Sequence, residues 1–166
     1  MVDMVRVQAL LDSWRSVRQD TARAVEDMPE AELDFRPVPE VMTFREIARH
    51  ILGASHALTG MLLDGVETFN RDELVKRIPP VPADAGAAVL ASELRARLDE
   101  RLTALAAQSP EFYAGMVTRF DGQVVTRLEM IQTTKEHELT HRQQMFVYLR
   151  LKGIVPPTTR RRQAAR

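Results

Sequence analysis

Two helix-start motifs constrain the fold of this chain more than any other feature. Thr43-Phe-Arg-Glu46 and Thr126-Arg-Leu-Glu129 each combine a threonine with a glutamate three residues later, the pattern of a capping box. The first motif predicts a helix from Thr43 with Ile47, Ile51, Ala54, Leu58 and Met61 on its core face. The second predicts a helix that ends at Lys152-Gly153, with Pro156-Pro157 just beyond it.

Two further segments show apolar residues at helical spacing. One runs from Asp3 to Glu26, and its core face comprises Val7, Leu10, Trp14, Val17, Thr21, Val25 and Met28. The other has a predicted cap near Asp84 and presents Leu94, Leu98, Leu102 and Leu105. Four amphipathic helices predict an all-α fold, a helical bundle.

The connections between these helices differ in kind. Pro29 to Met42 contains Arg36-Pro37-Val38-Pro39, which predicts an extended linker, and Val66 to Pro82 is long and ends in prolines. Val117 to Val125 has Asp121-Gly122 at its centre, which suggests a two-residue hairpin. We therefore expect long crossover connections between some of the helices.

Length and composition fit one domain without covalent cross-links. The chain has 166 residues and no cysteine, which excludes disulfides, thiolate metal sites and a protein thiol nucleophile. We assign residues 1–157 to the bundle and 158–166 to a basic tail with four arginines. A disordered tail is the favoured interpretation, and a contact with nucleic acid or a membrane is the alternative.

Charge and hydropathy limit the kinds of partner that we expect for this protein. The chain has 23 basic and 23 acidic residues, and a net charge of zero argues against general nucleic-acid binding. No apolar run approaches the roughly 20 residues of a membrane helix. The first residues lack the pattern of a signal peptide, so we expect a cytoplasmic protein that acts on a small molecule.

The histidines are the main candidates for a functional site. His137 and His141 are four residues apart in the last predicted helix, about 40° apart around its axis, so both rings can reach one ion. His50 falls within the apolar arc of its helix, whereas His56 falls on the expected solvent face. Three imidazoles from two helices predict a divalent metal site with open positions, and buried core histidines are the alternative.

Glu138 belongs to a second sequence motif, whose interpretation competes with that of a three-histidine site. His137-Glu138-Leu139-Thr140-His141 matches the H-E-x-x-H signature of metalloproteases, but no His, Asp or Glu follows it to serve as the usual downstream ligand. Glu138 is a candidate catalytic base or a residue that orients a ligand. An ion pair with Arg142, four residues later, is the competing interpretation.

Two stretches resemble the DinB/YfiT-like superfamily of metalloenzymes. They are Glu32-Leu-Asp-Phe-Arg-Pro-Val-Pro39 leading through Thr43 to His50, and His137-Glu-Leu-Thr-His-Arg-Gln-Gln144 continuing through Tyr148 to Pro157. The resemblance implies a four-helix bundle with up-down-down-up topology, a metal site at His50, His137 and His141, and a homodimer. Met42 and Gln143 depart from the family pattern, which commonly has tryptophan and glycine there.

The resemblance also implies an activity. Relatives include transferases and isomerases that use low-molecular-weight thiols, and others are called hydrolases by analogy. We expect one divalent ion, with zinc or nickel favoured and iron, copper or manganese allowed, in an enzyme of thiol S-transferase or hydrolase type. A non-catalytic metal-binding module for stress response or interaction is the alternative, and a protein without metal is a third.

Overall fold

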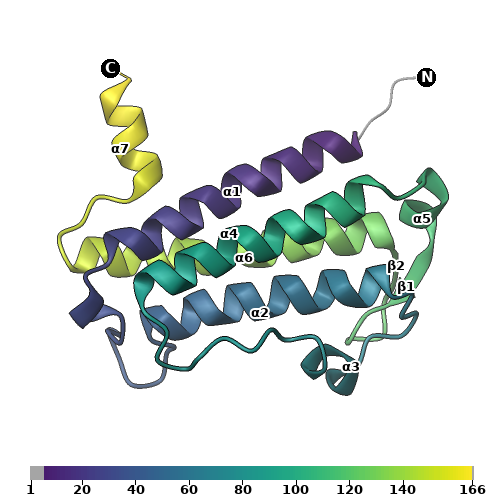
Figure 1. Ribbon diagram of the computed structural model, residues 1–166, viewed down its shortest axis with the longest axis horizontal. Helices are drawn as coiled ribbons and strands as arrows, with labels where there is room; N and C mark the ends of the chain where they lie inside the picture. The colour runs from purple at the N-terminus through teal and green to yellow at the C-terminus, as the bar shows by residue number, and fades with distance from the viewer. Residues whose placement is uncertain (1–5, 166) are drawn as a thin grey trace.

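The computed structural model describes residues 6–165 and shows a bundle of four long helices (Figure 1). These are α1 (Val7–Asp27), α2 (Phe44–Leu63), α4 (Ala87–Ala106) and α6 (Arg127–Leu151). In Figure 1, α1 and α6 run in one direction and α2 and α4 in the other, which is an up-down-down-up topology. α1 and α2 each pack against both α4 and α6, so they lie diagonally across the bundle. The expected all-α four-helix bundle is confirmed.

Shorter elements fill the connections. They are the 3₁₀ helix η1 (Glu30–Glu32), α3 (Arg71–Val75), α5 (Pro110–Ala114), β1 (Met116–Thr118), β2 (Val124–Thr126) and α7 (Pro157–Ala164). The segment between α2 and α4 runs back along the length of the bundle and carries α3 (Figure 1). This segment is the expected long crossover, and it lets two consecutive long helices run in the same direction.

Both capping boxes form as predicted. The Thr43 hydroxyl accepts the Glu46 N–H at 3.1 Å, and the Glu46 carboxylate accepts the Thr43 N–H at 2.7 Å. Thr126 and Glu129 make the same pair of bonds at the start of α6. These bonds satisfy backbone donors that have no partner inside the helix, and so they fix where α2 and α6 begin.

The other two long helices begin without a capping box. The described part of α1 begins at Val7, and the predicted start at Asp3 lies outside the described residues. α4 begins at Ala87 with Gly86 as its N-cap, two residues beyond Asp84, near which the cap was predicted. The carboxylate of Glu30 accepts the Ala87 N–H at 3.0 Å, so the cap comes from a distant part of the chain.

The hairpin between α5 and α6 has one more loop residue than predicted. β1 and β2 pair antiparallel with Val117 opposite Val125, and the Arg119 N–H donates to the Gln123 carbonyl at 2.8 Å. The Gly122 N–H closes a turn on the Arg119 carbonyl at 3.0 Å, and Gly122 has a φ of 83°. A turn followed by a left-handed glycine is the usual three-residue hairpin loop, so Asp121-Gly122 does not form a two-residue turn.

The basic tail is ordered where the structure describes it. Residues expected to be disordered form most of α7, which ion pairs fix to α1. Arg161 makes two bonds to Asp20, at 2.7 and 3.0 Å, and Arg160 lies 2.8 Å from Asp27. Acidic residues on α1 thus bind the arginines that the sequence left without partners.

The core has two apolar clusters with a polar layer between them. One cluster includes Met28, Phe44 and Leu149, and the other includes Leu11 and Leu102. The buried polar side chains between them include Arg18, Thr21, Ser55 and Glu138. This layer crosses the bundle near the middle of α1, α2 and α6.

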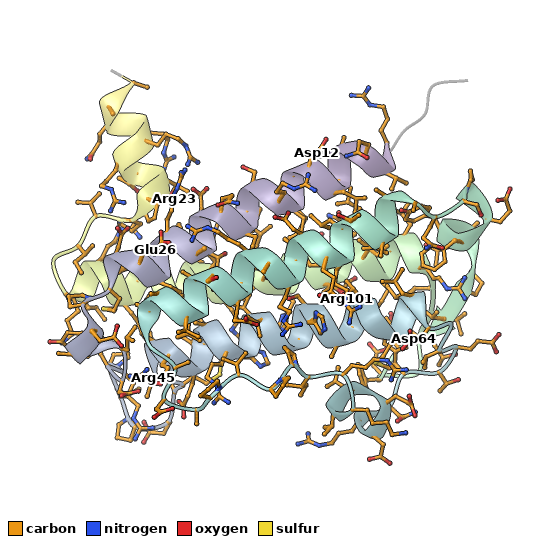
Figure 2. The ribbon with its side chains drawn as sticks, in the orientation of Figure 1. Asp12, Arg23, Glu26, Arg45, Asp64 and Arg101 are labelled. Carbon is orange, nitrogen blue, oxygen red and sulfur yellow. The ribbon has the colours of Figure 1, made fainter. Side chains whose placement is uncertain are left out.

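Charged side chains cover the outside of the bundle (Figure 2). Asp12 and Arg23 lie on the outer side of α1, and Arg101 extends from α4 toward α2. Arg45 binds Asp34 and the carbonyl of Asp84, which holds two connections at the start of α2. None of the helices in residues 6–165 combines the length and the hydropathy of a membrane-spanning segment.

Candidate metal centre

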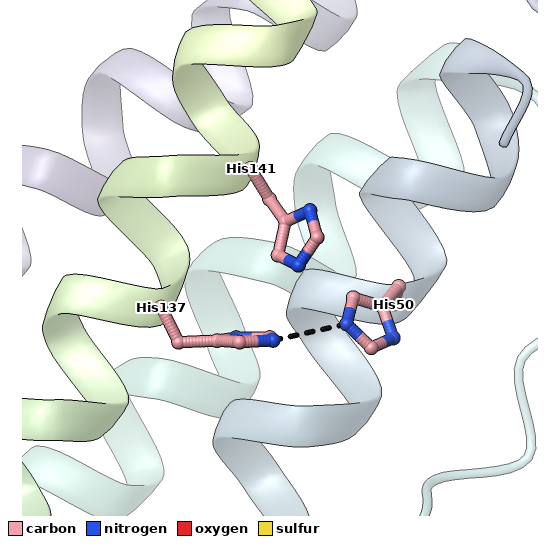
Figure 3. Close-up of side chains that lie close together, drawn as sticks. All are labelled: His50, His137 and His141. Carbon is pink, nitrogen blue, oxygen red and sulfur yellow. Dashed lines mark hydrogen bonds between the residues drawn. The ribbon is translucent and has the colours of Figure 1, made fainter. Parts of the chain in front are cut away.

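Three histidines converge between α2 and α6 (Figure 3). His50 from α2 faces His137 and His141 from α6. The Nε2 atoms of His50 and His137 are 3.0 Å apart, and one nitrogen from each ring lies within 4.8 Å of the others. The structure therefore brings together the three residues that sequence analysis selected.

The local fold explains this convergence. His137 and His141 are one helical turn apart on the same side of α6, so their rings point in similar directions. The capping boxes set the starts of α2 and α6, and the two helices pack directly against each other. The packing of α2 against α6 then places His50 opposite His137 and His141 at the interface between the two helices.

The predicted burial of the two α2 histidines is wrong in both cases. His50, expected in the bundle interior, is exposed, and His56, expected on the solvent face, is only 9% exposed. α2 is covered on more than one side, because it also packs against α4 and the crossover, where Ile78 approaches Gly53. The histidine cluster therefore lies at the surface between α2 and α6.

The surroundings favour neutral imidazoles at this cluster. Although His50 is exposed as a residue, its ring is partly desolvated at the interface between α2 and α6, and this desolvation, followed by the charge of His141, lowers its pKa below the ordinary value. Burial, followed by the charges of His141 and His50, lowers the pKa of His137 to about 4. At neutral pH the rings of His50 and His137 thus keep the lone pairs that metal binding requires.

Gln144 orients the third ring. The Nδ1 atom of His141 lies 2.8 Å from the Gln144 Oε1 atom, an arrangement that suits an Nδ1–H donor and an amide acceptor. The Nε2 atom of His141 then carries the lone pair. Metal-ligating histidines commonly have such a partner at the second nitrogen. Sequence analysis did not select Gln144, although its spacing of three residues from His141 places it on the same side of α6.

The donor set fits one divalent ion. A metal binds imidazole nitrogen at about 2.0–2.1 Å, so nitrogens that share a tetrahedral ion lie roughly 3.3 Å apart. Nitrogens within 4.8 Å of one another reach such positions by small rotations of their side chains. Three protein ligands leave at least one coordination position for a small molecule.

A cavity opens beside the histidines. It has a volume of about 370 Å³, and both His50 and His137 line it. Its remaining walls come from α2, α3, α6 and the hairpin loop, and comprise Ala54, Leu58, Leu74, Arg119, Phe120, Asp121, Met130, Thr133 and Thr134. A pocket of this size accepts a small organic molecule next to the candidate metal position.

The Glu138 carboxylate does not lie beside the ring nitrogens of the three histidines. Its carboxylate is buried and accepts bonds from Arg18 at 2.8 Å, Trp14 Nε1 at 2.7 Å and Thr21 at 2.9 Å. Burial alone would raise the Glu138 pKa, but the charge and hydrogen bonds of Arg18, together with the hydrogen bonds from Trp14 and Thr21, outweigh it and lower the pKa. These contacts favour a structural role, and the catalytic role stays a prediction.

The competing interpretations of the motif find little support. Among residues 6–165, Arg142 pairs with Asp20 at 3.9 Å and not with Glu138. A protease would need Glu138 beside the metal, but the carboxylate lies in the core. The two-stranded hairpin is also the only sheet in the described chain.

A four-helix bundle with three converging histidines is the class of protein that this geometry defines. The sequence model of the DinB superfamily matches residues 13–145, so the chain belongs to the DinB superfamily. A comparison with curated proteins found no match.

Two positions depart from the family pattern, Met42 and Gln143. Met42 is partly buried, and its carbonyl accepts the Tyr148 hydroxyl at 2.9 Å, whereas Gln143 is exposed.

Solved structures share the fold at low identity. The DinB-like protein YjoA from Bacillus subtilis has 21% identity and a TM-score of 0.70, over 87% of this chain and 92% of that one. YfiT from Bacillus subtilis, described as a probable metal-dependent hydrolase with an unusual four-helix bundle topology, has 16% identity and a TM-score of 0.66, over 93% of each chain. The mycothiol-dependent maleylpyruvate isomerase has 14% identity and a TM-score of 0.64, over 85% of this chain and 61% of that one.

Proposed function

We propose that the protein is a metal-dependent enzyme that activates a water molecule or a low-molecular-weight thiol for attack on a small electrophile. The observation that carries the proposal is a three-histidine cluster that opens onto a cavity of about 370 Å³. A purely structural metal site is usually closed by four protein ligands, whereas a catalytic one keeps an open position.

His50, His137 and His141 would hold the ion, and Gln144 would fix the ring of His141. A divalent ion held by neutral imidazoles lowers the pKa of bound water toward about 7, and that of a thiol as well. The apolar walls of the cavity, among them Leu58 and Met130, would exclude bulk water from the electrophile. Since the chain has no cysteine, the thiol would come from a cosubstrate.

The structural neighbours support both proposed reaction types, hydrolysis and thiol transfer. YfiT is described as a probable metal-dependent hydrolase, and another structural neighbour is a mycothiol-dependent isomerase. Their fold and the histidine cluster agree with hydrolysis and with thiol transfer. Zinc or nickel is the proposed ion. A homodimer, a cytoplasmic location and the absence of nucleic-acid partners stay predictions.

Metal analysis of protein purified without a histidine tag tests the binding step. We expect about one ion per wild-type chain, none in His141→Ala, and a reduced affinity in Gln144→Ala, by about tenfold. His56→Gln is the matched control on α2, because His56 lies against Arg101 and outside the cluster. Equal metal loss in His56→Gln and His141→Ala would contradict the assignment of the ligands.

Turnover tests the catalytic step. The metal-loaded protein is assayed against a panel of esters, epoxides and activated alkenes, with and without low-molecular-weight thiols. We expect product formation that disappears with EDTA and in His137→Ala. Stoichiometric metal binding without metal-dependent turnover would instead support the alternative of a non-catalytic metal-binding module.

A further inference from the structure

The cavity beside the histidines has one cationic side chain in its wall. Most of the lining is apolar, with Leu58, Leu74, Phe120 and Met130 among its residues. Arg119 and Asp121, both from the hairpin loop, are its two charged lining residues. The same cavity thus offers an apolar surface, two candidate metal ligands and an ion pair.

The hairpin holds Arg119 in a defined place. The Thr118 N–H donates to the Glu67 carbonyl at 2.7 Å, and the Phe69 N–H donates to the Thr118 carbonyl at 2.9 Å. The rings of Phe69 and Phe120 also meet edge to face, with centroids 5.9 Å apart. The loop that carries Arg119 is therefore tied to the crossover segment.

Arg119 retains hydrogen-bond donors for a ligand. Its Nη2 atom lies 3.2 Å from Asp121, and within residues 6–165 its guanidinium makes no other ion pair. Asp121 has fewer atoms to offer, because one carboxylate oxygen pairs with Arg119 and the other accepts the Gln123 N–H at 3.2 Å. The pair is partly exposed, so an incoming anion can join it at little cost. The hydrogen-bonding groups that this pair leaves for a ligand are therefore mainly the donors of Arg119.

We infer that this cavity binds small carboxylic acids with an apolar body, and that Arg119 binds the carboxylate. The planar guanidinium matches a carboxylate with two parallel donors. The apolar body then packs against Leu58, Phe120 and Met130, and the other end of the molecule faces His50 and His137. The inference that such an acid binds follows from the residues of the cavity alone. The further step, that the end of the acid facing His50 and His137 reacts, rests on the proposed function.

Three probes of one shape test this inference. They are 3-phenylpropionate, its neutral amide and the corresponding primary amine, titrated by NMR or calorimetry into the full-length protein, both metal-loaded and metal-free. In both forms we expect the carboxylate to bind roughly five- to tenfold tighter than the amide, because its bonds to Arg119 are charge-assisted. Tighter binding of the amine would overturn the inference, since it would assign recognition to Asp121.

Variants connect the preference to Arg119 and to this cavity. In Arg119→Met we expect the carboxylate and the amide to bind equally, and in Arg119→Lys most of the preference to remain. Arg71→Met is the matched control, because Arg71 is exposed at the start of α3 and does not line this cavity. Ala54→Leu fills the cavity from α2 and should weaken all three probes. Unchanged binding in Ala54→Leu would place the probes elsewhere and overturn the inference.

The metal-free titration separates the two proposals. If the carboxylate preference survives Arg119→Met but vanishes with EDTA, the ion binds the carboxylate, and this inference fails while the proposed metal site stands. If the preference depends on Arg119 but no metal-dependent turnover exists, the carboxylate site stands and the proposed function fails.

Discussion

The ring of His56 illustrates how a single buried group can make stability depend on pH. Arg101 Nη2 lies 2.8 Å from His56 Nε2, so the neutral ring accepts this bond. The Nδ1 atom is buried without a partner among the described residues. Burial, followed by the positive charge of Arg101, lowers the pKa of His56 to about 4, with smaller effects from Glu100 and Arg97 on α4.

We predict that His56→Gln removes part of the loss of stability in acid. The folded pKa is about 4 and the ordinary value is 6.5, so the unfolded chain binds more protons between these values. The contribution of His56 is therefore fully present above pH 6.5 and is lost as the pH falls toward 4. Over the interval from pH 6.5 to 5 the wild type should lose about 1.5 kcal/mol more than the variant.

Urea unfolding at several pH values measures this difference. His50 and His137 are unchanged in the variant, so their contributions cancel when the two proteins are compared. Parallel curves of unfolding free energy for wild type and variant would show that His56 does not titrate differently on folding.

At the scale of elements, α6 has two functional sides. His137 and Glu138 are adjacent, and successive residues point about 100° apart on a helix. The histidine faces α2, whereas the glutamate binds Arg18, Trp14 and Thr21 of α1. Arg18 also donates to the Leu94 carbonyl of α4 at 2.7 Å and to Ser55 of α2 at 2.7 Å. The polar layer thus fixes the rotation of α6, and with it the direction of the histidines.

Glu138→Gln should therefore reduce stability much more than it reduces metal stoichiometry. The substitution leaves the Arg18 charge buried without a counterion, which costs about 3–5 kcal/mol. Glu136→Gln is the control on the same helix, because Glu136 is exposed and its loss should change stability by less than about 0.5 kcal/mol. Denaturant unfolding and metal analysis give the two quantities. Loss of turnover without loss of stability would restore the role of Glu138 as a base.

Sequence predicted those elements whose signals are local. The capping boxes at Thr43 and Thr126 are complete within four residues, and both helices begin where predicted. The start of α4 lies within two residues of the prediction, but its capping group, the Glu30 carboxylate, was missed because it belongs to another segment. The burial of His56 was missed because a single helix does not reveal that the crossover and α4 cover its second side.

The candidate site was likewise predictable in part from the sequence. The spacing of His137 and His141 predicted the pair, and His50 joins them as expected, although it lies at the exposed side of the interface and not in the interior that its apolar phase predicted. The cavity wall was not predictable, because Arg119 and Phe120 line the same cavity as His50 and His137 only once the hairpin has folded against the bundle. The partner of Glu138 was also missed, because Arg18 is 120 residues away in sequence.

At the scale of the whole molecule, the histidines join two helices that have no direct connection in sequence. α2 and α6 are separated by the crossover, α4 and the hairpin, and they run in opposite directions (Figure 1). The apolar clusters hold them from inside the bundle, while the exposed side of their interface carries the histidines. An ion at that position would act as a second, external connection between α2 and α6.

Metal binding should therefore raise the melting temperature. A ligand that binds only the folded state at a hundredfold excess over its Kd contributes about 2.7 kcal/mol. For a chain of this length, 1 kcal/mol corresponds to roughly 2–4 °C, so we expect a shift of about 5–10 °C between EDTA-treated and metal-saturated protein. Calorimetry of the wild type, His141→Ala and His56→Gln makes the comparison. The shift should vanish in His141→Ala, which loses a ligand, and persist in His56→Gln, which keeps all three. An equal shift in all three proteins would mean that the ion binds elsewhere, because a site at His50, His137 and His141 cannot stabilise a chain that lacks one of its ligands.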